Sequence, residues 1–199
     1  KLVAAAQQER FTGRKFDHSF PADAIRSCLA LAGLTIGDVT AVGHNFDYGP
    51  LRPVFSRTPE GTDLFDACLD PGVQVRWFSA HDLPVGRVEP VRHHDAHAWH
   101  AALTHDDMPA TVVVADGVGE TASLSIYDFD GSAVRRIRSW PITASLGLFY
   151  SLITQQLGWL PNSDEHMVMG LAAYGDPARY RDVMRRAVEL RPDGGVRVR

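Results

Sequence analysis

With 199 residues, 45% of them hydrophobic and 22% charged, the chain has the size and composition of one globular domain or a large part of one, which excludes a disordered or collagen-like protein. The net charge of −4 and the scattered basic residues make nucleic acid a poor partner, because phosphate binding needs clustered positive charge. No apolar run approaches the roughly 20 residues that a bilayer requires, so we expect a cytoplasmic protein. Cys28 and Cys68 lack the close spacing of zinc thiolate sites, so we expect both to be buried thiols.

The first half of the chain alternates predicted strands and helices. Residues 2–6 are a short apolar run typical of a strand, and residues 21–33 have the apolar spacing of a helix. Residues 45–72 contain so many Pro, Gly and Asp residues that we expect an irregular loop with one helical turn at 63–69. Short extended runs are predicted at residues 39–43, 73–77 and 88–91.

The second half of the chain has more regular patterns. Apolar residues at helical spacing predict helices at residues 94–104, 145–157, 165–174 and 177–190. Apolar alternation and β-branched residues predict strands at residues 111–115, 122–129 and 134–140. We expect the first of these strands to be buried on both faces of a sheet, and the second to be its antiparallel return. The elements together predict an α/β class with a mixed sheet flanked by helices.

Both ends of the chain fall where a strand is expected. The natural hairpin partner of residues 2–6 would precede them, and residues 197–199 continue in an extended pattern after the turn Asp193-Gly194-Gly195. Because the first residue is also not methionine, we expect the chain to be part of a longer protein.

Five of the nine histidines fall between residues 93 and 105. His93 and His97 are four residues apart, so a helix presents both imidazoles on one face, within reach of one divalent ion. Asp116 follows the apolar strand and would add a carboxylate at the edge of the sheet. Two imidazoles and one carboxylate leave coordination positions open, which is typical of a catalytic or ligand-binding metal site. A histidine pair of this spacing also occurs on solvated helices, so the pair alone leaves both interpretations open.

Two glycine-bearing turns have the composition of anion-binding loops. Asp116 is followed by Gly117, Gly119 and Glu120, and the N–H groups of a glycine-rich turn can approach a phosphate. Gly147 lies near the start of a predicted helix, where free N–H groups also attract anions. An ordinary hairpin turn and an ordinary helix cap fit the same residues, so the patterns alone do not decide.

Five strings of the sequence, taken in order, resemble the O-carbamoyltransferases of the nodulation protein U and cephem or aminoglycoside carbamoyltransferase family. They are AQQERFT at 6–12 with Lys15, HHDAHA at 93–98, DGVGE at 116–120, SLG at 145–147 with Tyr150, and MGLAAYG at 169–175. The resemblance implies an actin-like ATPase fold (ribonuclease H-like, sugar kinase/Hsp70 superfamily), with residues 1–199 forming part of an N-terminal domain. It also implies a YrdC-like C-terminal domain, absent from this chain, that makes carbamoyl-adenylate from carbamoyl phosphate and ATP.

The resemblance assigns roles to individual residues. It implies that His93, His97 and Asp116 bind a divalent metal, with iron expected and zinc or manganese as the other options. It implies that catalytic Lys15 reaches the carbamoyl-adenylate, and that the carbamoyl group passes to a hydroxyl of a small molecule such as an antibiotic. The implied contacts of the nucleotide are Gly117, Gly119, Glu120, Gly147, Asn162 and Gly170.

The sequence departs from the family pattern at two positions. Met167 stands where related sequences usually carry Lys, which removes a cation that could contact a phosphate, and Ala173 replaces the usual Pro. The family histidine that is an option for the general base belongs to a hairpin absent here. The irregular segment 47–72 is the place where we expect contacts to the acceptor, since loops on a rigid scaffold carry specificity, and a plain surface loop fits the same residues equally well.

Two other functions use the same residues. A metal-dependent hydrolase or a non-haem iron oxygenase would also employ His93, His97 and Asp116, although alternating helices and strands fit poorly with the all-β fold of such oxygenases. A catalytically incompetent subunit of the same fold would bind nucleotide and metal without turnover. Met167 favours this last alternative, and Lys15 and the three metal ligands argue against it.

Overall fold

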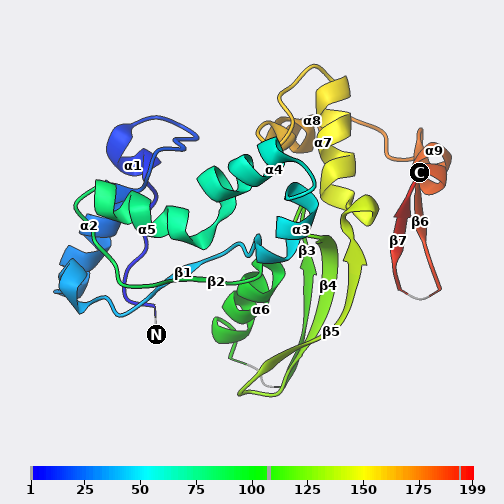
Figure 1. Ribbon diagram of the computed structural model, residues 1–199. Coiled ribbons are helices and arrows are strands. Elements are labelled where there is room, and N and C mark those ends of the chain that lie inside the picture. The colour runs from blue at the N-terminus through cyan, green and yellow to red at the C-terminus, as the bar shows by residue number, and fades with distance from the viewer. Residues whose placement is uncertain (1, 107–108, 193) are drawn as a thin grey trace. The chain divides into compact units, whose positions relative to one another are not determined.

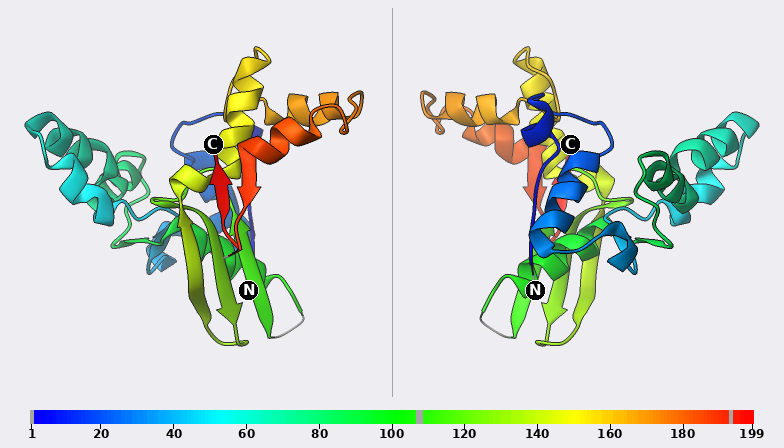
Figure 2. Two further views of the ribbon diagram at one scale, coloured as in Figure 1. Left: turned by 90° about the vertical axis from the view of Figure 1, so that its right-hand side faces the viewer. Right: turned by 90° about the vertical axis from the view of Figure 1, so that its left-hand side faces the viewer.

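The computed structural model describes residues 2–106, 109–192 and 194–199, so Asp193 of the expected last turn lies outside the described residues. The chain divides into two compact units, Lys1–Val91 and Arg92–Arg199 (Figures 1 and 2). Each unit has its own hydrophobic core. Among the described residues, no helix has both the length and the apolar character needed to span a bilayer.

The first unit contains a two-stranded parallel sheet. Its strands are β1 (Val42–His44), which begins later than the run expected at 39–43, and β2 (Val88–Pro90), found where it was predicted. The helix predicted at 21–33 is confirmed as α2 (Ala22–Ala32). The core of the unit consists of Ala22, Phe78, Leu83, Val85 and Val88.

The segment between β1 and β2 is largely helical, which corrects the expectations of a loop at 45–72 and of a strand at 73–77. Thr58 and Asp70 are N-caps, whose side chains accept hydrogen bonds from the N–H groups of Gly61 and Gly72. The Pro and Asp residues that indicated a loop are therefore helix starts. The elements are η2 (Gly49–Leu51), α3 (Arg52–Phe55), α4 (Pro59–Leu64), the π-helical η3 (Phe65–Leu69) and α5 (Pro71–Ala80).

Two further expectations for the first unit are wrong. Residues 2–6 carry no regular secondary structure and pair with no strand of the described residues, and a strand needs a hydrogen-bonded partner. Cys28 is only partly buried, because the buried residues of α2 are Ala22 and Ala24, and Cys68 is exposed, because the buried side chain of η3 is that of Phe65. The remaining elements of this unit are α1 (Glu9–Thr12) and η1 (Ile36–Asp38).

The second unit contains a three-stranded antiparallel sheet in the order β3–β4–β5 (Figure 1). The strands confirm the sequence prediction for this region, and their bounds are β3 (Ala110–Ala115), β4 (Ala122–Phe129) and β5 (Val134–Pro141). Val113 faces away from the core and is 61% exposed, which corrects the expectation that its strand is buried on both faces. The strand alternates buried and exposed residues, as a sheet covered on one face requires.

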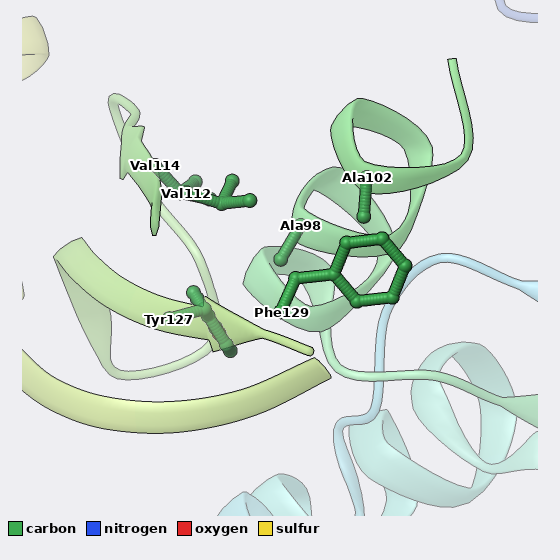
Figure 3. Close-up of a cluster of buried hydrophobic side chains, with 6 residues drawn as sticks. All are labelled: Ala98, Ala102, Val112, Val114, Tyr127 and Phe129. Atoms are coloured by element: carbon green, nitrogen blue, oxygen red, sulfur yellow. The ribbon is translucent and has the colours of Figure 1, made fainter. Parts of the chain in front are cut away.

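The predicted histidine-rich helix is present as α6 (His93–Leu103), and it covers one face of this sheet. Its buried side consists of His94, Ala98 and Ala102, which are four residues apart. Figure 3 shows the two alanines of α6 beside the side chains of the sheet with which they form the core of the unit. The side chains from the sheet are Val112, Val114, Tyr127 and Phe129.

The rest of the second unit consists of helices followed by a short hairpin. The helix expected at 177–190 begins later, at Arg181, and ends earlier, at Ala187, because its last residues pair with the final strand of the chain as β6. Parallel and antiparallel pairs occur in separate small sheets of the described residues, so the α/β class is confirmed but one mixed sheet is not. The elements are η4 (Ile142–Ala144), α7 (Leu146–Gln156), α8 (Glu165–Ala172), α9 (Arg181–Ala187), β6 (Val188–Leu190) and β7 (Val196–Val198).

Candidate metal centre and adjoining cavity

Three possible metal ligands converge in the second unit. His93 and His97 lie one turn apart on α6, and Asp116 directly follows β3. The Nε2 atom of His93 is 2.7 Å from Oδ2 of Asp116, and the Nε2 atom of His97 is 3.1 Å from that of His93. The Nε2 atom of His97 is also 3.3 Å from the same Oδ2. The structure therefore brings together the three side chains that the sequence predicts as metal ligands.

The separations of these atoms are compatible with a shared divalent cation. Nε2 of His93 carries either a proton or a lone pair, so it cannot donate to Asp116 and accept from His97 at the same time. Two ligand atoms that lie roughly 2.1 Å from one ion, at right angles, are about 3 Å apart, which is close to all three separations. Two imidazoles and one carboxylate are also a donor set that suits iron or zinc.

Asp116 is held in its ionised form by its neighbours. Burial raises the pKa of this carboxyl group, but the N–H of Gly117 and the imidazole of His93 lower it by more, and the resulting pKa is below its ordinary value. The Gly117 N–H donates to Oδ1 at 2.6 Å, which leaves Oδ2 toward the two imidazoles. Asp116 thus offers a negatively charged ligand atom at neutral pH.

A cavity of about 180 Å³ adjoins Asp116, and Gly117, Gly147 and Val196 of β7 also line it. A Cβ atom on Gly117 would meet nothing within 4 Å, so the space on that side of the residue is open. A Cβ atom on Gly147 would lie 2.5 Å from Cα of Gly117, so the start of α7 rests directly on the segment that carries Asp116. Ser145 secures this contact, because its hydroxyl donates to the carbonyl of Gly117 at 2.6 Å.

The other expected nucleotide contacts have different surroundings. A Cβ atom on Gly119 would lie 2.9 Å from Cδ2 of His94, and Oε1 of Glu120 accepts a hydrogen bond from the N–H of His93 at 2.8 Å. Both residues therefore contact the start of α6. Asn162 and Gly170 are not among the described residues that line the cavity of about 180 Å³.

Lys15 lies in the first unit, in a loop that Glu9 closes. The N–H of Phe16 donates to Oε2 of Glu9 at 3.1 Å, and the exposed Lys15 has its Nζ atom 4.8 Å from the ring centre of Phe16. Gln8 is buried, and its Oε1 atom accepts a hydrogen bond from the N–H of Ala24 in the first turn of α2. Within the string AQQERFT, Gln8 thus attaches the loop to α2, and Glu9 connects the two ends of the loop.

Two residues that the sequence patterns did not indicate contact the chain neighbours of the candidate ligand His93. Ser125 and Tyr127 lie on the buried side of β4 and hydrogen-bond to His94 and Asp95 of α6. Polar residues at alternate positions of an otherwise apolar strand were the signal that could have identified them, because a buried polar group needs a partner.

Comparison with known proteins identifies relatives along the whole chain. A family model described as "Carbamoyltransferase N-terminus" matches residues 79–198. Nodulation protein NolNO of Sinorhizobium fredii is 29% identical over 100% of this chain and 30% of its own length. Uncharacterized protein sll1178 of Synechocystis is 31% identical over 99% of this chain and 35% of its own length. Nodulation protein NolO of Bradyrhizobium diazoefficiens is 38% identical over 54% of this chain and 20% of its own length. The chain thus spans about a third of the length of the first two relatives.

Proposed function

The chain belongs to the carbamoyltransferase family, and from this membership we propose that the protein transfers a carbamoyl group from carbamoyl-adenylate to a hydroxyl of a small molecule, such as an antibiotic. In this proposal the chain is part of an N-terminal domain with the actin-like ATPase fold. A YrdC-like C-terminal domain makes the carbamoyl-adenylate from carbamoyl phosphate and ATP. The observation that carries the proposal is the convergence of His93, His97 and Asp116 within the segment that the family model matches.

His93, His97 and Asp116 would hold one divalent metal, for which iron is the first choice and zinc or manganese are alternatives. When bound, the metal supplies Lewis-acid stabilisation of the negative charge that develops during the transfer. The protein contributes two imidazoles in fixed positions on α6 and a carboxylate that the Gly117 N–H keeps ionised. Little conformational freedom is then lost when the metal binds.

The cavity beside Asp116 is the proposed site of the adenylate phosphate. Its volume of about 180 Å³ is below the range of about 300–1,000 Å³ typical of sites for whole ligands, so it suits the phosphate with part of the ribose. Gly117 and Gly147 line it, and the N-terminal N–H groups of α7 would attract the negative charge. Gly119 and Glu120 contact the start of α6 and are not among the residues that line this cavity. Asn162 and Gly170 do not line it either.

In the transfer itself, the acceptor hydroxyl gives its proton to a base, its oxygen forms a bond to the carbamoyl carbon, and the bond from that carbon to the adenylate oxygen breaks. Negative charge therefore accumulates on the phosphate of the leaving adenosine monophosphate. Lys15 keeps the role that the family resemblance gives it, which is to reach the carbamoyl-adenylate, and its exposed ammonium group on a closed loop is chemically suited to neutralise such a charge.

The test measures metal content and carbamoyl transfer in the full protein and in His97→Ala, with His100→Ala as the matched control. His100 is on the same helix but outside the three-residue cluster. We expect about one divalent ion per chain in the wild type and in the control, and at least a tenfold weaker metal affinity in His97→Ala. Radiolabelled carbamoyl phosphate, ATP and aminoglycoside or cephem acceptors should give a carbamoylated product and adenosine monophosphate, with little product from His97→Ala.

Three outcomes would contradict parts of this proposal. Full metal content in His97→Ala would exclude the assigned ligands. Binding of metal and nucleotide without carbamoyl transfer would favour a catalytically incompetent subunit. Turnover that requires oxygen and 2-oxoglutarate would indicate an oxygenase instead.

A further inference from the structure

The first three residues of α6 are each hydrogen-bonded to the β3–β4 hairpin. One of the three partners lies in the connection between the strands, and the other two lie on the buried side of β4. The pairs are the N–H of His93 with Oε1 of Glu120 at 2.8 Å, Nδ1 of His94 with Oγ of Ser125 at 2.8 Å, and Oδ1 of Asp95 with the hydroxyl of Tyr127 at 2.6 Å. The first turn of α6, which carries the candidate ligand His93, is thus hydrogen-bonded to the β3–β4 hairpin.

The rotation of α6 about its axis decides where the two ligand nitrogens lie. His93 and His97 each precede a residue of the buried side of the helix, His94 and Ala98, by one position. The ligand face is therefore about 100° around the axis from the buried face. For a ligand atom about 6 Å from the axis, a rotation of 10° moves it by about 1 Å. This displacement exceeds the roughly 0.5 Å within which a functional site must be held.

Apolar packing alone opposes such a rotation only weakly. The buried side of α6 presents the methyl groups of Ala98 and Ala102, which permit a close approach to the sheet but are small and nearly symmetrical. Hydrogen bonds are directional, so those at His94 and Asp95 resist rotation. Nε2 of His94 is buried without a hydrogen-bond partner among the residues that the structure describes, and the bond from Nδ1 to Ser125 offsets the cost of burying this ring.

We propose that Ser125 and Tyr127 are positioning residues of the candidate metal centre, which act through His94 and Asp95 to fix the rotation of α6. They thereby hold the Nε2 atoms of His93 and His97 against Asp116. This inference rests on the metal site of the proposed function, and it extends the site to four residues that are not ligands.

The decisive comparison is between Ser125→Ala and Ser123→Ala. Both serines are buried on the same side of β4, but the hydroxyl of Ser123 donates to the carbonyl of Pro141 at 2.9 Å. Each variant loses one buried hydroxyl, and Ser125→Ala also leaves both ring nitrogens of His94 without a partner among the described residues, so we expect the larger loss of stability in Ser125→Ala and compare the cobalt affinities of the folded proteins. Tyr127→Phe removes the other anchor and keeps the aromatic ring in the core.

The first readout is the affinity of the metal-free full protein for Co²⁺, titrated by absorbance. We expect Ser125→Ala and Tyr127→Phe to weaken cobalt binding by about tenfold or more, and Ser123→Ala to stay within about twofold of the wild type. Thermal unfolding and circular dichroism establish that each variant is folded. Equal cobalt affinities in the wild type, Ser125→Ala and Tyr127→Phe would overturn the inference, as would an equal loss in Ser123→Ala.

The second readout is independent of any metal. Nitrogen-15 NMR of the metal-free protein reports the surroundings of the His93 and His97 rings. We expect Ser125→Ala to shift the signals of both rings, and Ser123→Ala to leave them unchanged; unchanged signals in Ser125→Ala would overturn the positioning role. A wild type that binds no cobalt would refute the proposed metal site, and the ring signals would still decide whether Ser125 positions the pair.

Discussion

Replacement of Gly147 by alanine tests how closely the start of α7 packs against the segment that carries Asp116. The added Cβ atom would lie 2.5 Å from Cα of Gly117, 2.8 Å from its nitrogen and 3.3 Å from the carbonyl carbon of Asp116. Favourable contacts between carbon atoms begin at roughly 3.5 Å, so the two segments would have to separate by about 1 Å. All three atoms belong to the backbone, so no flexible side chain can absorb this displacement.

Helix propensity and packing predict opposite signs for this change. Replacing glycine by alanine inside a helix stabilises it by up to about 1 kcal/mol. Overpacking of a well-packed region costs about 1–3 kcal/mol, with more where the backbone must move. We therefore expect Gly147→Ala to lower the free energy of unfolding by about 2 kcal/mol, which corresponds to a decrease of roughly 4–8 °C in the unfolding midpoint of a chain of this length.

Urea and thermal unfolding measure this change, and Gly170→Ala is the matched control. Gly170 lies within α8, where a Cβ atom would meet nothing within 4 Å. Only helix propensity acts there, so we expect the control to gain up to about 1 kcal/mol. A Gly147→Ala protein that is as stable as the wild type would refute the conclusion that α7 rests directly on Asp116 and Gly117.

Two other substitutions test local contacts. Gln8→Ala removes the buried acceptor of the Ala24 N–H, and we expect it to lower the free energy of unfolding by about 1–3 kcal/mol in urea; no change would contradict the attachment of the Lys15 loop to α2. Asp130 accepts hydrogen bonds from the backbone and the hydroxyl of Ser132, which lower its pKa from the ordinary 3.8. Its carboxylate therefore stabilises the fold above that pH, and the stabilisation is lost as the pH falls through the lower pKa of the folded state. Asp130→Asn should accordingly be less stable than the wild type at neutral pH, with a difference that shrinks in strong acid, whereas a difference independent of pH would exclude a role of the charge.

Most elements of the second unit could be predicted because their signals are local. Alternating residues indicate β4 and β5, a β-branched run indicates β3, and helical spacing of apolar residues indicates α6 and α7. The burial of β3 could not be predicted in the same way. Whether a strand is covered on one face or on both depends on what packs against it, and Val113 shows that one side of β3 stays exposed.

The segment between β1 and β2 shows where local signals mislead. Pro, Gly and Asp residues occur both in loops and at helix starts, so the composition of residues 45–72 is compatible with either. In the structure Thr58 and Asp70 are helix N-caps. The β-branched residues of 73–77 favour a strand in isolation. In α5 the burial of Val73 and Phe78 overrides that propensity, because packing outweighs the small intrinsic preferences of single residues.

The sequence by itself determined the spacing of His93 and His97 on one helix, the position of Asp116 at the end of a strand, and the string of motifs that indicates the family. Only the tertiary structure decided that Asp116 at the end of β3 meets His93 of α6 and that Gly147 rests on Gly117. It also decided that Ser125 and Tyr127 contact the first turn of α6. These contacts join residues far apart in the chain. They depend on the register of the sheet and on the rotation of a helix packed against it, which local patterns do not specify.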